Sequence, residues 1–221
     1  MKAAVFLSGC GVFDGAEIHE AVLSLLHLKK NGFEYQCFAP DVAQHHVVNH
    51  RSGEEMAESR NVLTEAARIA RGKIQPLTDY RAEDYDAVVM PGGFGVAKNF
   101  TRWAFEGPQG AILPELAAAL RATLAARRPI AALCMAPAVL ARAIGHDGPA
   151  LRLTVGVIDE VADGMTSLGM QAVACGVAEP CIDRENRVVT VPCYMMEADI
   201  VAIDQGVAAG IKALRELVAQ P

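Results

Sequence analysis

The sequence predicts an α/β protein built around a doubly wound, mostly parallel β-sheet with helices on both faces. Short apolar runs alternate with segments of helical periodicity along nearly the whole chain, which is the pattern of successive β-α units. The apolar runs are continuous, as in strands that are covered on both faces. Glycine-rich turns follow some of these runs, at the carboxyl ends of strands where such folds place their sites.

The N-terminal half alternates in this way from its start. The apolar run after Met1 predicts a strand, and Ile18, Val22 and Leu25 then recur at helical spacing until Gly32 ends the helix. In chain order, this half is expected to contain a strand at 2–8, a helix at 15–32, a strand at 33–41, a helix at 59–72 and a strand at 85–95.

The C-terminal half continues the alternation and closes with a long helix. Pro129 begins a short apolar run, and Gly145 ends the helix that follows it. In chain order, this half is expected to contain a helix at 112–128, a strand at 129–134, a helix at 136–145, a strand at 186–192 and a helix at 196–219.

One domain is expected over residues 1–221, because a chain of this length can bury one sizeable core. Two segments do not fit the alternation. Residues 39–57 are polar and irregular, which predicts an inserted loop over one end of the sheet. Residues 148–183 contain short strand-like pieces between Gly and Asp turns, which predicts a small hairpin extension.

Composition argues against several classes of partner. The net charge of −6 disfavours nucleic acid and anionic membranes. No apolar run reaches the ~18 residues that a membrane helix needs, and the N-terminus lacks the long apolar region of a signal peptide. The six cysteines are scattered without a C-x-x-C pair, so reduced thiols and a cytoplasmic location are expected.

Neither a nucleotide nor a metal is indicated. Gly9 and Gly11 begin a dinucleotide-like pattern, but Asp14 stands where the third glycine belongs. His45, His46 and His50 are close in sequence, but no paired cysteines or H-E-x-x-H helix accompanies them. No cofactor is therefore expected, and His50 remains a candidate for a pocket loop.

Cys134 lies between a predicted strand and a predicted helix with almost no room for a loop. The unpaired N–H groups and the dipole of a helix N-terminus favour a thiolate, and the same N–H groups can hold an oxyanion. Two interpretations are open: a nucleophile elbow, or a small buried apolar residue. We prefer the second interpretation for the other five cysteines.

Two further segments should share the carboxyl edge of the sheet with Cys134. The turn at Gly92 and Gly93 can aim a backbone N–H into the same space, to complete an oxyanion hole with the N–H of Met135, or it is a simple tight turn. Glu17, in the first turn of its helix, would approach the thiol. Alternatively it only complements the helix dipole, as Glu20 would do equally well.

The segments GAEIHE, VVMPGGFG and ALCMAP, in this order and spacing, resemble the superfamily of PfpI-like proteases and the Parkinson-disease-associated deglycase, which has the flavodoxin-like fold of class I glutamine amidotransferases. SGCGVFDGAEIHE, NHRSGE and GGFGVAKN further resemble the bacterial ElbB group of glyoxalases. The resemblance implies Cys134 as the nucleophile and Glu17 as the carboxyl beside it. Gly92, Gly93 and Met135 would form the backbone shell.

The chain departs from two branches of this superfamily. Met135 stands where the protease branch has histidine, and no imidazole occurs around Tyr194, where amidotransferases have a triad histidine. Both departures weaken a protease or amidase function. Phe94, Asn99, His50 and Tyr194 are the candidates for the substrate pocket.

The resemblance implies a cofactor-free, glutathione-independent glyoxalase of the lyase type, with slow turnover and deglycase activity as an extension. Its substrate would be a small dicarbonyl, glyoxal or methylglyoxal, which becomes a 2-hydroxy acid through a hemithioacetal on Cys134. The alternative is a non-catalytic, redox-sensing or chaperone-like protein that uses an oxidisable Cys134. The relatives also imply a homodimer, with neither nucleic acid nor membrane as a partner.

Overall fold

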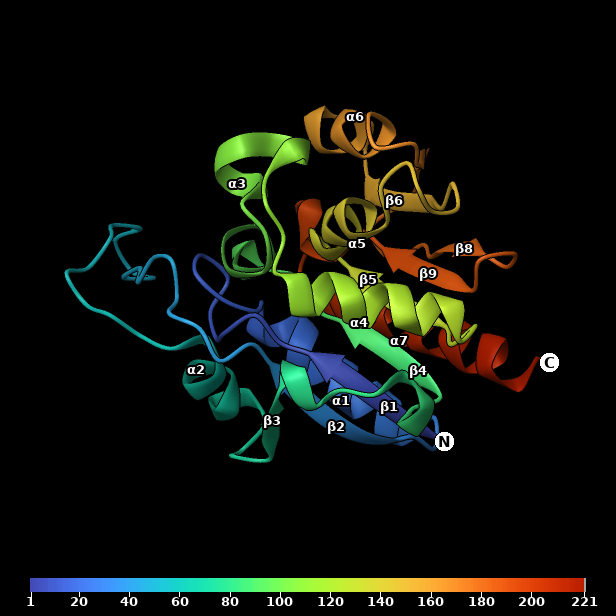
Figure 1. Ribbon diagram of the computed structural model, residues 1–221, viewed down its shortest axis with the longest axis horizontal. Coiled ribbons are helices and arrows are strands. Elements are labelled where there is room, and N and C mark those ends of the chain that lie inside the picture. Colours follow the sequence, from blue (N-terminus) through green and yellow to red (C-terminus); the bar gives the residue numbers. More distant parts are fainter. Residues whose placement is uncertain (221) are drawn as a thin grey trace.

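A seven-stranded sheet forms the centre of the computed structural model, which describes residues 1–220 (Figure 1). The strand order is β3-β2-β1-β4-β5-β9-β8, and every neighbouring pair is parallel except β8 with β9. The strands of this sheet are β1 (Lys2–Phe6), β2 (Glu34–Ala39), β3 (Ile74–Pro76), β4 (Ala87–Met90), β5 (Ile130–Leu133), β8 (Cys181–Asp183) and β9 (Val188–Val191).

Helices cover both faces of the sheet. The first helix, α1, packs against the closing helix α7 on one face, while α4 packs against α5 on the other, in front of the sheet in Figure 1. The helices are α1 (Ile18–Lys30), α2 (Val62–Ile69), α3 (Trp103–Glu106), α4 (Pro114–Ala125), α5 (Ala136–Ile144), α6 (Glu160–Thr166) and α7 (Ile200–Ala219). None of them is long and apolar enough to cross a membrane, as far as residues 1–220 are concerned.

The central strands are as buried as their continuous apolar sequences require. Every residue of β4, β5 and β9 is buried, and β1 exposes only Lys2 at its start. A strand with helices on both faces has no solvent face, so it carries no polar alternation. The predicted doubly wound sheet is confirmed.

The segment 148–183 differs from the predicted hairpin. Its strands β6 (Arg152–Gly156) and β7 (Gln171–Ala174) form a separate parallel pair. Because parallel neighbours need a crossover, α6 connects them. A hairpin does occur, but it lies at the end of the segment, where β8 turns back to pair with β9 at the edge of the main sheet.

The segment between β2 and α2 has no regular strand or helix, only isolated bridges such as Val48 with Glu55. Figure 1 shows it as a long loop that reaches away from the sheet.

Short elements that the sequence analysis did not anticipate lie elsewhere: β3, α3, and a π-helix at Val96–Phe100. Three-residue strands and single turns are too short to have a period of their own.

The order in which strands are added to the sheet changes direction between β1 and β4. From β1 the chain proceeds outward through β2 to β3, then returns to β4 and continues through β5. The loops after β1 and β4 leave the sheet at this point of its carboxyl edge, which is the usual site of function in such sheets. Hydrogen bonds join the two loops, from the N–H of Glu17 to the carbonyl of Gly92 at 2.9 Å and from the N–H of Phe94 to the carbonyl of Val12 at 2.7 Å. Cys134 directly follows β5 at the same edge.

Candidate active site

Cys134 is held in a strained turn between β5 and α5. Its φ is +56°, in the left-handed region that non-glycine residues seldom adopt. Its N–H donates to the Val191 carbonyl on β9 at 2.9 Å, and α5 begins two residues later with Pro137 in its first turn. The neighbouring strand and the helix start thus fix the backbone, and strain of this kind is typical of functional positions.

The chain at Gly92 passes so close to this cysteine that no side chain fits there. A Cβ on Gly92 would lie 2.4 Å from the Cβ of Cys134 and 2.9 Å from its Sγ. It would also lie 2.9 Å from Oε2 of Glu20. Glycine is therefore required at position 92 by contact with the site and not only by its turn.

Glu20 is the carboxyl that lies against the thiol. Its side chain is fully buried, Oε2 accepts the Gly92 N–H at 2.9 Å, and Oε1 accepts the Tyr194 N–H at 3.2 Å. Oε2 of Glu20 and Sγ of Cys134 would each lie 2.9 Å from a Cβ on Gly92, so the carboxyl and the thiol face the same small space. Burial, followed by the nearby charge of Glu17, raises the pKa of Glu20 to about 8.

The position expected for Glu17 is thus taken by Glu20. Glu17 is the N-cap of α1, and its Oε2 accepts the Glu20 N–H at 2.7 Å. A cap side chain folds back along its own helix to satisfy a free N–H. Glu20 is one turn further on, and its side chain reaches the sheet edge between Gly92 and Tyr194.

The thiol of Cys134 is not the low-pKa group that its helix start predicts. Burial, and then the charge of Glu20, raise its pKa well above the ordinary value. The N–H groups of Gly93 and Met135 act in the opposite direction and lower the pKa of this thiol. A shell around the sulfur stays a prediction for these two N–H groups. The N–H group of Gly92 is engaged by Glu20 instead.

A histidine that the sequence analysis did not single out lies beside the buried pair. Nδ1 of His19 is 2.9 Å from the Tyr194 hydroxyl and 4.0 Å from Oε1 of Glu17. The His19 side chain is about half exposed. Tyr194 therefore contacts the solvent-facing His19 through its hydroxyl and the buried Glu20 carboxyl through its backbone N–H. The available signal was the position of His19 between two glutamates in EIHE.

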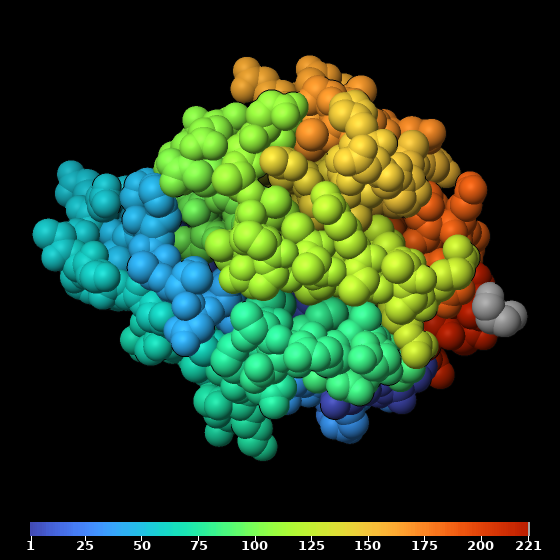
Figure 2. Space-filling view, in the orientation of Figure 1, coloured from blue at the N-terminus to red at the C-terminus, as the bar shows by residue number. Residues whose placement is uncertain are grey.

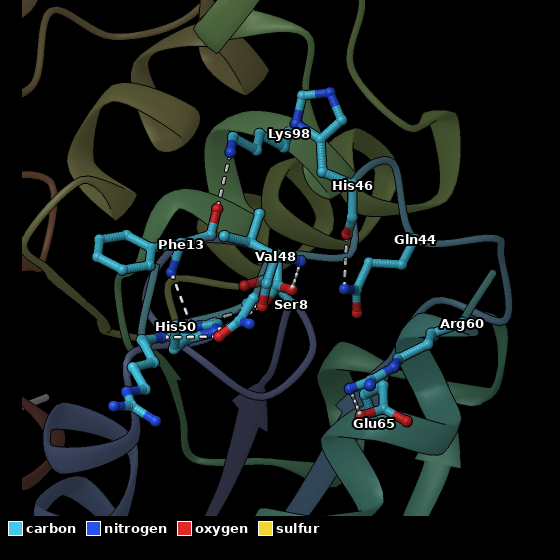
Figure 3. A network of polar contacts seen from close by, with 12 residues as sticks. Ser8, Phe13, Gln44, His46, Val48, His50, Arg60, Glu65 and Lys98 are labelled. Carbon is cyan, nitrogen blue, oxygen red and sulfur yellow. Dashed lines mark hydrogen bonds and ion pairs between the residues drawn. The ribbon is translucent and has the colours of Figure 1, made fainter. Parts of the chain in front are cut away.

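His50 and Asn99, both pocket candidates, tie loops together. Nε2 of His50 accepts the Phe13 N–H at 3.2 Å, and the two rings stack (Figure 3). Asn99 donates to the carbonyls of Ser8 and Asp14 at 2.8 and 2.9 Å. Its Oδ1 accepts the N–H of His45 at 2.9 Å. Both residues therefore order the loop after β1.

Phe94, the remaining pocket candidate, is 52% exposed in the loop after β4. The Lys98 amine lies 5.4 Å from the centre of its ring and donates to the Phe13 carbonyl, a contact visible in Figure 3.

His45 and His46 pack against Phe105 rather than around a common point. Within the described residues, no group of three or more His, Cys, Asp or Glu side chains is placed to hold a metal.

A cysteine at a strand-to-helix elbow, on a flavodoxin-like sheet with helices on both faces, defines the class I glutamine-amidotransferase-like proteins. Residues 9–191 match the DJ-1/PfpI family, and the chain belongs to that family. The matched range includes Glu20, Gly92 and Cys134. The ElbB subgroup stays a prediction.

Curated relatives and solved structures resemble the chain over nearly its full length. The rat ES1 protein homolog, mitochondrial, is 41% identical over 98% of this chain and 84% of its own. An isoprenoid biosynthesis protein with an amidotransferase-like domain from Ehrlichia chaffeensis has a TM-score of 0.90 at 36% identity, covering 97% of this chain and 98% of its own. Glyoxalase III from Candida albicans, at 13% identity and a TM-score of 0.59 over 97% of both chains, shares the fold.

The expected cytoplasmic location is contradicted by these comparisons. The rat relative and a human relative, glutamine amidotransferase-like class 1 domain-containing protein 3, are mitochondrial by name. Scattered free cysteines indicate a reducing environment, but they do not distinguish the cytoplasm from another reducing compartment.

Replacing Asn99 by alanine should destabilise the protein by about 2–4 kcal/mol, because it leaves two buried carbonyls and one partly buried N–H without their partner. The free energy of unfolding in urea measures the effect. Asn49→Ala, in an exposed part of the same loop network, should cost less than about 1 kcal/mol. Equal, small costs for the two variants would show that Asn99 does not hold the loops together.

Proposed function

We propose that the protein is a glutathione-independent glyoxalase that converts glyoxal or methylglyoxal to a 2-hydroxy acid. The observation that carries the proposal is the position of Glu20 and Cys134 at Gly92, where a Cβ would lie 2.9 Å from both Oε2 of Glu20 and Sγ of Cys134. The N–H groups of Gly93 and Met135 are close enough to lower the pKa of this thiol. Together these groups supply a soft nucleophile, an acid/base whose pKa is near neutrality, and donors for developing negative charge. All of these groups belong to the chain itself, so the reaction needs no cofactor.

The first step joins sulfur to the aldehyde carbon. The ionised Glu20 carboxylate removes the S–H proton of Cys134 as the sulfur attacks, and it then passes that proton to the aldehyde oxygen to give a hemithioacetal, which leaves Glu20 ionised again. The N–H groups of Gly93 and Met135 stabilise the charge on sulfur before attack and on oxygen during it. This step needs the two groups in contact, as Glu20 and Cys134 are.

The second step moves a proton between adjacent carbons. Glu20 removes the proton from the former aldehyde carbon, and the electrons pass to the neighbouring carbonyl to form an enediol. Protonation of that neighbouring carbon gives a thioester of the 2-hydroxy acid, so one carbon is oxidised as the other is reduced. Water then releases the acid and restores the thiol, and the sum is dicarbonyl plus water to hydroxy acid.

The pKa of the pair explains why turnover would be slow at neutral pH. With a pKa of about 8, Glu20 is mostly protonated at pH 7, so only a minority of molecules holds the base. The raised pKa of Cys134 also makes a redox-sensing role less favourable, because oxidation proceeds through the thiolate. Deglycase activity would use the same hemithioacetal chemistry on a glycated adduct.

Glu20→Gln should lower the rate of methylglyoxal conversion by about 100-fold or more, because an amide cannot accept the transferred proton. The matched control is Glu17→Gln, whose side-chain oxygen can still cap α1 and whose effect should be under about fivefold. Lactate formation measures the rate, and circular dichroism checks that both variants fold. If Glu17→Gln is the more damaging change, Glu17 and not Glu20 is the acid/base.

The value of kcat/KM should rise with pH and level off above the pKa of Glu20, so that the midpoint of the rise lies near pH 8. Below that pH the ionised fraction, and with it kcat/KM, falls about tenfold for each pH unit. A pH profile of kcat/KM for methylglyoxal between pH 5.5 and 9.5 (a range of about four units) measures this. A profile that is flat through neutrality would contradict a base of raised pKa.

We also propose a homodimer that uses the exposed apolar face of α1. Ile18, Val22 and Leu26 recur on one side of this helix with 44, 47 and 43% of their surface exposed, and the adjacent α7 exposes Ile200 and Val201.

Analytical ultracentrifugation should give twice the chain mass, and Val22→Lys should shift the species to the monomer. Ile158→Lys, on an exposed apolar residue elsewhere, should not. A wild-type protein that sediments as a monomer would exclude the dimer.

A further inference from the structure

A cavity of about 420 Å³ lies at the amino edge of the sheet, opposite the edge that carries Cys134. Its wall comes from the end of α4, the segment after α5, and the turn before β9. In Figure 2 the first two of these, yellow-green and yellow, lie side by side on the visible face. The Ile130 N–H at the start of β5 donates to the carbonyl of Arg187, one of the lining residues.

Three arginines line this cavity: Arg121, Arg127 and Arg187. Among residues 1–220, no ion pair joins any of them to a carboxylate. One carboxylate, that of Asp147, also contributes to the wall. Guanidinium groups without acidic partners form a surface that attracts anions.

Arg187 is the most informative of the three. It is only 9% exposed, and its Nε is fully buried without a hydrogen-bond partner among the described residues. One Nη donates to the carbonyls of Leu217 and Gln220 at 2.7 and 3.2 Å. Arg187 thus caps the end of α7, but capping leaves Nε unsatisfied, and a buried unpaired donor is costly.

The electrostatic environment favours an anion of high charge. Burial, and then the like charges of Arg127 and Arg128, lower the pKa of Arg187. The two remaining cationic lining residues are held by backbone carbonyls, Arg121 by Ala143 at 2.7 Å and Arg127 by Glu185 at 3.4 Å. A bound anion would compensate this repulsion.

The rest of the wall is apolar and includes Leu124, Ile144 and Pro149. A volume of about 420 Å³ is in the range of small-molecule sites, which combine an apolar lining with a few polar anchors. We propose that the cavity is a second binding site, separate from the thiol, for a small organic phosphate. The phosphoryl group binds the three arginines and the organic part contacts the apolar wall.

Isothermal titration calorimetry on the intact protein tests this with inorganic phosphate, phenyl phosphate and benzoate. Phenyl phosphate should bind most tightly, because it alone offers both a dianion and an apolar group. Benzoate binding as tight as that of phenyl phosphate would overturn the assignment to a phosphate. Absence of binding by both phosphates would overturn the site.

Arg127→Gln and Arg121→Gln should each weaken phenyl phosphate binding by about tenfold, as expected for loss of one charge-assisted hydrogen bond. The side chains of Arg121 and Arg127 are both exposed, so the fold should tolerate the changes. Arg71→Gln is the matched control, since Arg71 is also exposed and shares the φ of +53° of Arg127. Affinity unchanged in the two cavity variants, or reduced equally in Arg71→Gln, would overturn the site.

Discussion

The contact of Gly92 with both Cys134 and Glu20 is the constraint on which the rest of the site depends. The three residues come from three separate segments, the loop after β4, the end of β5 and the first turn of α1. They meet because β4 lies between β1 and β5 in the sheet. Without a side chain at position 92, the carboxyl and the thiol can both approach the space that its Cβ would occupy.

This arrangement keeps an acid in a place that disfavours its charge. In the folded protein the pKa of Glu20 is about 8 instead of the ordinary 4.5. A pKa raised by folding means that the protonated form is the better tolerated one. The contribution of Glu20 to stability is therefore fully present below pH 4.5 and is lost as the pH rises through about 8. Reactivity and stability thus depend on opposite protonation states of the same carboxyl.

The two edges of the sheet provide different chemistry. The carboxyl edge holds a buried, nearly neutral pair of titratable groups, covered by loops that Asn99 and His50 tie together. The amino edge holds arginines that are always charged, around a cavity. Because the rigid strands β5 and β9 run between the two edges, one sheet can carry both sites without contact between them.

The sequence by itself determined the doubly wound sheet, its principal strands and helices, and the cysteine at the elbow. These features depend on local signals: continuous apolar runs, helical periodicity, and a strand that passes directly into a helix. Gly92 and Gly93 were also found in this way, because a glycine pair directly after a buried strand indicates a tight turn at the edge of the sheet.

Only the tertiary structure decided which glutamate reaches the thiol, how the segment 148–183 folds, and where the arginines gather. Glu17 and Glu20 are both acids at the start of one helix, so the sequence cannot tell the cap from the buried partner. The choice depends on Gly92 and Tyr194, which are 72 and 174 residues away from Glu20. For the same reason burial, which no local pattern records, raised the pKa of Cys134 where the helix start alone would have lowered it.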